Sequence, residues 1–211
     1  MILFSFPSSP FGCKVKAVIL ACGLQEKIII KEWHPWQPDN EFRKLNPLGK
    51  IPVLQTSDQT IFDSPVICEY LMEKAGMLAK LMPNRFKSLK TQALVDGMND
   101  AAVSMRYERY FRPLHLQCDD WYDRQHLALT SGLEYFEANL KDQLNNLLLF
   151  ENLCVATMLS YFEIRFADLA FAKTYPKLYH WYGAFMDSHP FLESAKAKDH
   201  PIPADILRLQ K

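Results

Sequence analysis

The sequence predicts an α+β domain followed by an all-α helical bundle. Up to Gly76 the spacing of the apolar residues changes repeatedly between short strand-like runs and helical steps. From about residue 86 onward the apolar residues recur only at steps of three and four, which is typical of amphipathic helices. A chain of 211 residues, 49% of them hydrophobic, is long and apolar enough to form two compact units.

The chain begins with a predicted strand, helix and second strand. Residues 2–6 form a short apolar strand candidate. Ser9 and Pro10 then begin a helix, with Ser9 as its N-cap and Pro10 at its first position. Gly23 follows this helix, where a glycine commonly takes the left-handed conformation. The Ile-rich residues 27–32 predict the next strand.

A short helix, a turn, a hairpin and a further helix complete this domain. We expect the short helix near residues 39–45 and a turn at 46–49, which reads Asn-Pro-Leu-Gly. Strands at 51–55 and 60–62 predict a hairpin, and residues 64–76 predict a helix that starts with Ser-Pro and ends with Gly. The order is βαβαββα, with a parallel crossover first and an antiparallel pair later, which is the thioredoxin-like arrangement.

The second half carries only helical signals. We place the thioredoxin-like domain at residues 1–77, a linker at 78–85 and the all-α bundle at 86–211. The helices expected in the bundle share apolar spacings of three and four and cover residues 94–105, 129–144, 152–166 and 176–186, with a last short one from Pro190.

Composition excludes several classes of function. Lys and Arg balance Asp and Glu at 24 against 24, so no overall charge favours nucleic acid or an anionic membrane as a partner. The longest apolar run, residues 17–22, is far shorter than the about 20 residues that span a bilayer. Without a basic segment at the N-terminus, we expect a cytoplasmic protein. Five cysteines and six histidines lack the spacing of disulfide or metal sites, so we expect reduced thiols and no metal.

Two of the predicted helices begin with Ser-Pro directly after a strand. A helix N-terminus presents unpaired N–H groups and a partial positive charge, so the starts at Ser9 and Ser64 can bind one elongated anionic ligand. Asp63 adds a carboxylate that can hold an ammonium group. A ligand with a carboxylate, an amine and a thiol fits this set. Each Ser-Pro taken singly is also explained as a helix cap, which contributes ~1 kcal/mol.

Pro52 stands at the start of a predicted strand, where a proline is tolerated. If the bond before it is cis, the backbone N–H and C=O of Ile51 turn outward and can pair with a peptide ligand as an added strand would. The sequence leaves both isomers open.

Three segments of the first domain together form a family pattern. They are Ser9-Pro10-Phe11 with Lys14-Val15, residues 46–54 and residues 62–71. This ordered set resembles the glutathione-binding domain of the serine-type bacterial cytosolic glutathione S-transferases. The resemblance continues more weakly at residues 93–101 and 159–165, so it covers essentially the whole chain.

The resemblance implies glutathione as co-substrate, no metal, and Ser9 as the catalytic residue. Ser9 would hydrogen-bond the glutathione sulfur and favour the thiolate. A free thiol has a pKa near 8.5, and helix N-termini can lower such values by one to several units. The thiolate would then attack the carbon of an electrophilic second substrate.

The resemblance also implies how the rest of glutathione would be held. Ile51 would pair with the cysteinyl unit through its backbone, next to a cis Pro52. Asp63 and Ser64 would hold the γ-glutamyl amine and carboxylate, and Lys50 would lie near a ligand carboxylate.

The second substrate, a small hydrophobic electrophile, would lie between the two domains. The candidate lining residues are Phe11, Met105, Tyr107 and Tyr110, although core packing or dimer contacts explain them equally well. The resemblance also implies a homodimer, in which Asp96 and Asp100 could face the partner.

Two positions depart from the family pattern. Cys13 stands where the family often has Arg, and we interpret it as a partly buried helical thiol. The alternative is a Cys-dependent thioltransferase, but such relatives carry Cys where this chain has Ser9. Leu149 and Asn152 stand where the family has the capping box of the central bundle helix. Asn152 could still cap this helix, but the reciprocal hydrogen bond of the box is lost. We therefore expect a less stable bundle.

Three functions therefore stay open. The leading hypothesis is a detoxifying glutathione S-transferase that conjugates glutathione to small electrophiles. A glutathione-dependent isomerase, dehalogenase or peroxidase would use the same thiolate. A non-catalytic interaction protein, similar to the stringent starvation proteins, would have no reason to combine Ser9 with Asp63 and Ser64.

Overall fold

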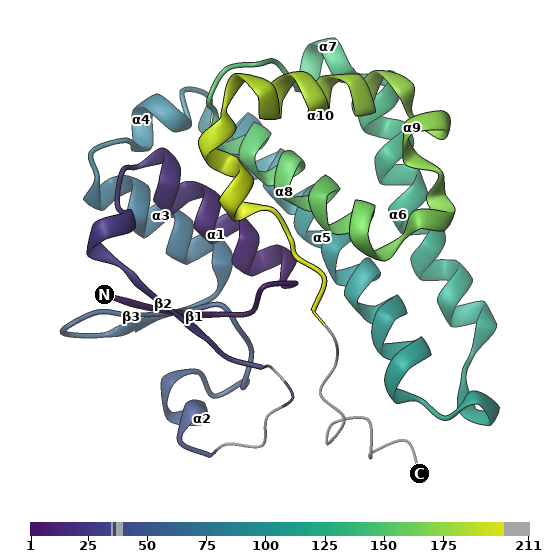
Figure 1. The fold of residues 1–211 in the computed structure, drawn as a ribbon, viewed down its shortest axis with the longest axis horizontal. Coiled ribbons are helices and arrows are strands. Elements are labelled where there is room, and N and C mark those ends of the chain that lie inside the picture. Colours follow the sequence, from purple (N-terminus) through teal and green to yellow (C-terminus); the bar gives the residue numbers. More distant parts are fainter. Residues whose placement is uncertain (35, 37–39, 201–211) are drawn as a thin grey trace.

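A four-stranded mixed sheet organises the first half of the chain (Figure 1). The computed structural model describes residues 1–34, 36 and 40–200. The strands are β1 (Ile2–Ser5), β2 (Ile29–Glu32), β3 (Val53–Gln55) and β4 (Thr60–Ile61), in the spatial order β2-β1-β3-β4. Strand β1 runs parallel to β2, with Ile2 opposite Ile29, and antiparallel to β3, with Leu3 opposite Leu54. The hairpin of β3 and β4 is antiparallel, so the predicted thioredoxin-like sheet is confirmed.

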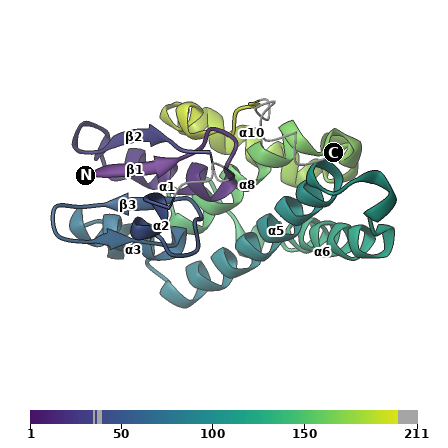
Figure 2. The ribbon, with the colours of Figure 1, turned by 90° about the horizontal axis from the view of Figure 1, so that it is seen from below.

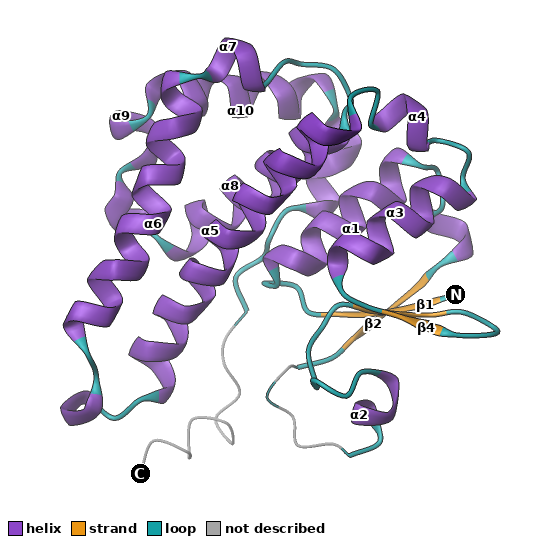
Figure 3. Ribbon diagram, turned by 180° about the vertical axis from the view of Figure 1, so that it is seen from behind, coloured by secondary structure: helices purple, strands orange, loops and turns teal. Residues whose placement is uncertain are grey.

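Helices cover both faces of this sheet. Helices α1 (Pro10–Ala21) and α3 (Ser64–Lys74) lie on one face, and the short α2 (Phe42–Leu45) lies on the other (Figure 3). Residues 35 and 37–39 fall outside the described part, so only the end of the helix expected near 39–45 can be compared. A 3-10 turn (Gln25–Lys27) includes Lys27, which we predicted as the first residue of the second strand.

The two Ser-Pro sequences begin helices in different ways. Ser9 is the N-cap of α1, and its Oγ accepts a hydrogen bond from the Gly12 N–H at 3.1 Å. In α3 the N-cap position belongs to Asp63, so Ser64 is the first helical residue and does not cap the helix. The cap explanation therefore holds for Ser9 and is wrong for Ser64. Both helices end as expected, with Gly23 and Gly76 at φ of 65° and 68°.

The second half is a helical bundle around α8 (Phe150–Arg165), which is buried at every residue from Phe150 to Phe162. Helix α5 (Arg85–Phe111) packs along α6 (Asp119–Ala138), and Figure 2 shows the pair running across the bundle. The remaining elements are α4 (Leu78–Leu81), α7 (Leu140–Gln143), α9 (Phe171–Thr174), α10 (Pro176–Ser188) and 3-10 turns at Leu114–Leu116, Ala167–Leu169 and Pro190–Ala195. Within the described residues, this half contains no strand and no helix long and apolar enough to cross a bilayer.

Two bundle predictions need correction. The helix expected over 129–144 is interrupted at Asn139, whose side-chain amide donates to the Tyr135 carbonyl at 2.9 Å at the end of α6. The predicted linker, 78–85, contains the short helix α4, and α5 already begins at Arg85. The domain boundaries at 77 and 86 stay a prediction.

Asn152 does not cap α8. Leu149 occupies the N-cap position with extended backbone and no side-chain hydrogen bond. The amide of the buried Asn152 instead donates backward, to Asn145 Oδ1 at 2.9 Å and to the Leu147 carbonyl at 2.8 Å. The first turn of α8 therefore lacks a side-chain cap.

We predict that Leu149→Ser stabilises the protein relative to Leu149→Ala. Both substitutions remove the same apolar side chain, but only serine offers an oxygen to the free N–H groups of the first turn. A cap contributes ~1 kcal/mol, which corresponds to about 2–4 °C in a chain of this size. Thermal unfolding followed by circular dichroism measures the difference, and equal melting temperatures for the two variants would contradict the missing cap.

Candidate functional site

A cavity of about 550 Å³ lies between the sheet domain and the helical bundle. Its lining comes from the end of β1, the start of α1, the loop before β3, the start of α3, one face of α5 and the end of α8. The predicted site residues that line it are Ser9, Phe11, Lys50, Ile51, Pro52, Asp63, Ser64, Tyr107 and Tyr110. Met105 is not among the lining residues and is fully buried in the core, so its assignment to the electrophile pocket is wrong and core packing explains it.

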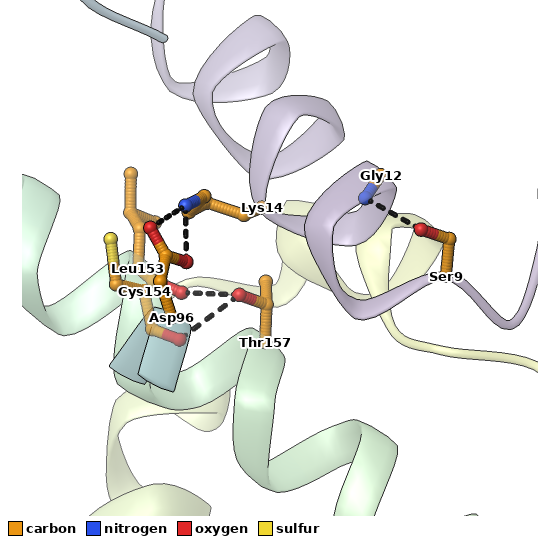
Figure 4. A network of polar contacts seen from close by, with 7 residues as sticks. All are labelled: Ser9, Gly12, Lys14, Asp96, Leu153, Cys154 and Thr157. Atoms are coloured by element: carbon orange, nitrogen blue, oxygen red, sulfur yellow. Dashed lines mark hydrogen bonds and ion pairs between the residues drawn. The ribbon is translucent and has the colours of Figure 1, made fainter. Parts of the chain in front are cut away.

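Ser9 is held at the cavity by the close approach of α1 to β1. A Cβ at Gly12 would lie 2.1 Å from the Oγ of the buried Ser5, so a side chain at Gly12 would push the helix start away. The Ser9 Oγ already accepts from the Gly12 N–H, as Figure 4 shows. A hydroxyl that accepts in this way keeps its hydrogen available, so Ser9 can donate to an anion in the cavity.

The loop before β3 is shaped by the buried Asn46. Its side-chain amide donates to the Lys50 carbonyl at 2.8 Å, and its Oδ1 accepts from the Leu48 N–H at 3.1 Å. Gly49 has a φ of 66°, which favours glycine. The bond between Ile51 and Pro52 is cis, as the resemblance implies.

The start of α3 brings a carboxylate and a hydroxyl to the opposite end of the cavity from Trp36 and the C-terminal part of α5. Asp63 is exposed and makes no capping bond, while Ser64 is 1% exposed at the first helical position. Burial raises the pKa of the Asp100 carboxyl; Lys50 opposes this shift and Asp63 adds to it. These groups can hold an ammonium through the carboxylates and a carboxylate through Ser64, its N–H and Lys50.

Asp96 and Asp100 line the cavity of their own chain, and their position at a dimer surface stays a prediction. Asp96 accepts two hydrogen bonds from the ammonium of Lys14, at 2.6 and 2.8 Å (Figure 4). Lys14 belongs to α1 and Asp96 to α5, so this ion pair joins the two halves of the chain. Burial disfavours the charge of Lys14, but the adjacent carboxylate overcomes this and raises the pKa of the ammonium.

Cys13 is fully buried in α1 and does not line the cavity. Burial raises the pKa of its thiol to about 11, and the Sγ contacts the Pro7 carbonyl oxygen at 3.7 Å. Cys13 is a helical thiol as expected, but it is fully buried where we expected partial burial. A protonated, enclosed thiol is a poor nucleophile.

The far end of the cavity is aromatic. Trp36 stacks on Phe111, with ring centroids 4.1 Å apart, and Tyr107 meets Trp36 edge-on at 5.0 Å. Trp36 and Phe111 were not among the site residues predicted from the sequence. The steps of three and four from Asp100 through Val103 and Tyr107 to Phe111 could have indicated one exposed face of α5.

In the described part of the chain, no three His, Cys, Asp or Glu side chains gather in a way that could hold a metal ion. The polar side chains that line the cavity are hydroxyls, carboxylates, an amide, imidazoles and basic groups, which suit a zwitterionic peptide.

Known proteins share this combination of fold and site sequence. A family model described as the N-terminal domain of glutathione S-transferase matches residues 8–74. The uncharacterised GST-like protein YibF of Escherichia coli is 36% identical over 140 residues, which cover 64% of this chain and 67% of the relative. A glutathione S-transferase from Methylobacillus flagellatus, solved with glutathione bound, is 30% identical with a TM-score of 0.79 and covers 92% of this chain and 98% of its own. The chain belongs to the glutathione S-transferase superfamily.

Other members of the superfamily have been solved with ligands. A glutathione transferase family member from Pseudomonas fluorescens with bound glutathione is 28% identical, with a TM-score of 0.84 over 94% of this chain and 99% of that chain. Another structure from that organism contains S-(propanoic acid)-glutathione; it is 27% identical, with a TM-score of 0.79, and covers 94% of this chain and all of that chain. The thioredoxin-like domain and the helical domain of this chain therefore have the architecture of the superfamily.

We predict that the native protein has one rapidly reacting thiol. Burial raises the pKa values of Cys13 and Cys22 to about 11 and of Cys68 to about 12, and that of Cys154 rises as well, whereas Cys118 is exposed. Titration with a chromogenic disulfide at pH 8 should show one fast thiol, which Cys118→Ser removes. Unfolding should release all five. Rapid modification in the Cys118→Ser variant would contradict the low reactivity that we expect of the buried Cys13, Cys68 and Cys154 and the partly buried Cys22.

We also predict that the two residues of the buried ion pair contribute unequally to the free energy of unfolding. Asp96→Asn leaves the ammonium of Lys14, 1% exposed, without a counter-charge, whereas Lys14→Met leaves Asp96, 19% exposed, beside the cavity. Removing one partner of a buried pair costs about 3–5 kcal/mol, and we expect Asp96→Asn to reach this range and Lys14→Met to cost clearly less. Urea unfolding measures both values, and the reverse order would show that Asp96 is the more strongly desolvated partner.

Proposed function

We propose that this protein is a glutathione S-transferase that joins the glutathione thiolate to small electrophiles. The observation that carries the proposal is that one cavity is lined by Ser9, by Ile51 in the loop before β3 and by the Asp63–Ser64 pair. These three groups match the thiol, the peptide backbone and the γ-glutamyl end of glutathione. The bound glutathione of the Methylobacillus and Pseudomonas relatives supports the choice of ligand.

Glutathione would extend across the end of the sheet. Its γ-glutamyl ammonium would lie near Asp63 and Asp100, and the γ-glutamyl carboxylate would accept hydrogen bonds from Ser64. The cysteinyl unit would pair with the backbone of Ile51 as an added antiparallel strand. Lys50 would face the remaining carboxylate. This orientation brings the sulfur to the start of α1.

Ser9 would activate the sulfur by donation. Its Oγ accepts from the Gly12 N–H, so the hydroxyl hydrogen is free to point at the sulfur. The partial positive charge at the start of the twelve-residue helix α1 favours the thiolate further. The thiolate attacks the electrophilic carbon, a carbon–sulfur bond forms, and the leaving group departs with its electron pair.

The conjugate in the second Pseudomonas structure, S-(propanoic acid)-glutathione, supports transfer to the sulfur as the reaction class. Our proposal further includes a cytoplasmic homodimer that acts in detoxification. The buried Cys13 gives no support to a Cys-dependent thioltransferase.

We predict that calorimetric titration detects glutathione at micromolar to low millimolar affinity in the wild type. Ser64→Ala should weaken binding by roughly tenfold or more, because a hydrogen bond to a charged group contributes about 1.5–3 kcal/mol. Ser9→Ala should keep most of the binding but lose turnover of 1-chloro-2,4-dinitrobenzene. Ser57→Ala, an exposed serine in the hairpin, is the matched control and should change neither quantity.

The absence of wild-type binding at millimolar glutathione would overturn the proposed function and leave the interaction-protein hypothesis in its place. Binding without turnover in the wild type would retain the glutathione site and reject the transfer reaction for this electrophile.

A further inference from the structure

Arg106 is a basic side chain in the cavity that takes no part in the glutathione contacts proposed above. It lies on α5 and lines the cavity beyond the acidic residues of the same helix. It stands six positions after Asp100, which places the two Cα atoms about 9 Å apart along the helix axis. The cavity therefore has an acidic end near the start of α3 and a basic end beside the aromatic wall.

The charge of Arg106 is not neutralised within the described part of the chain. Its guanidinium lies 3.7 Å from the centroid of the Tyr110 ring, and no carboxylate there forms an ion pair with it. The neighbouring Arg165 differs, because it is ion-paired with Asp199. A half-buried cation that faces a cavity without a counter-ion attracts an anion from solution.

Tyr161 provides a hydrogen-bond donor near Arg106. Its side chain comes from α8, is 4% exposed and lines the same cavity. Burial raises the pKa of Tyr161 to about 12, against the opposing effect of Arg106 and Arg165, so the hydroxyl keeps its proton at neutral pH. A carboxylate between them can accept one bond from the guanidinium and one from the hydroxyl.

The wall next to this basic end is shaped for a flat ring. Trp36 and Phe111 stack with an interplanar angle of 27°, and Tyr107 stands nearly perpendicular to Trp36 at 84°. Offset and edge-on contacts with such rings stabilise a planar aromatic ligand by about 0.5–1.5 kcal/mol for each pair beyond its buried area.

We propose that the second substrate is an aromatic electrophile that carries a carboxylate, with its ring against Trp36 and Phe111 and its carboxylate on Arg106 and Tyr161. This inference rests on the proposed function, because it names the substrate class of the same cavity. For a chloro-substituted ring, the glutathione thiolate bonds to the carbon that bears chlorine, and chloride leaves with the electron pair of the broken bond. The proton of the thiol passes to solvent.

The test compares two electrophiles that differ by the carboxylate, 4-chloro-3,5-dinitrobenzoate and 1-chloro-2,4-dinitrobenzene. We expect the wild-type kcat/KM, divided by the uncatalysed rate, to be about tenfold higher for the benzoate. Arg106→Met should lower kcat/KM for the benzoate by roughly 10- to 100-fold and for the neutral substrate by less than about threefold. Arg106→Lys should retain part of the preference, because the charge remains.

Arg124→Met is the matched control, since it removes the same charge from an exposed position on α6 outside the cavity. It should leave both rates unchanged. Three outcomes would overturn the proposed carboxylate site. Arg106→Met could lower the rates with both electrophiles equally, or lower neither. Arg124→Met could cause the same selective loss as Arg106→Met.

A binding measurement separates this inference from the proposed function. The unreactive 3,5-dinitrobenzoate and 1,3-dinitrobenzene are titrated without glutathione, with tryptophan fluorescence as the signal. Preferential binding of the benzoate that is lost in Arg106→Met supports the carboxylate site even where the wild type fails to bind glutathione. Equal binding of both compounds by the wild type overturns the inference and leaves the proposed function untouched.

Discussion

The buried ion pair between Lys14 and Asp96 is a polar contact that joins the two domains, and it adds to the packing of α1 against α8. Lys14 is 1% exposed, and a buried ammonium is tolerated only beside its counter-charge. Helix α1 is therefore held against α5 at one position, with the sheet and α3 on one side and α8 on the other. Because Ser9 caps α1 and Asp96 lines the cavity, this ion pair links the helix that carries the Ser9 hydroxyl to the bundle wall of the cavity.

Helix α5 gives the cavity its polarity. One face of this single helix passes from Asp96 and Asp100 to Tyr107 and Phe111, with Arg106 close to the aromatic end. In the proposed function, a peptide ammonium and an aromatic ring bind side by side along this one helix. A rigid helix holds two ligands in a fixed relative orientation at a lower entropic cost than loops would.

Stability and function are combined differently at the two helix starts. At Ser9 one oxygen both caps α1 and faces the cavity, so the presence of this serine does not by itself indicate a catalytic role. At α3 the cap position is Asp63, which makes no capping bond, and the buried Ser64 is the first helical residue. Neither side chain of the second pair caps its helix, so stability of the helix start does not explain this pair as it explains Ser9.

The sequence by itself determined the strand and helix order, the α1 cap, the glycine helix ends and most of the predicted site residues that meet in the cavity. These features depend on local backbone preferences and on motifs read in order. Only the tertiary structure decided which side chains are enclosed. Met105 and Cys13 are buried, Asn152 turns back to the preceding loop, and Arg106 faces the cavity beside Trp36. Apolar spacing identifies a helix face, but what covers that face is set by contacts between segments far apart in the chain.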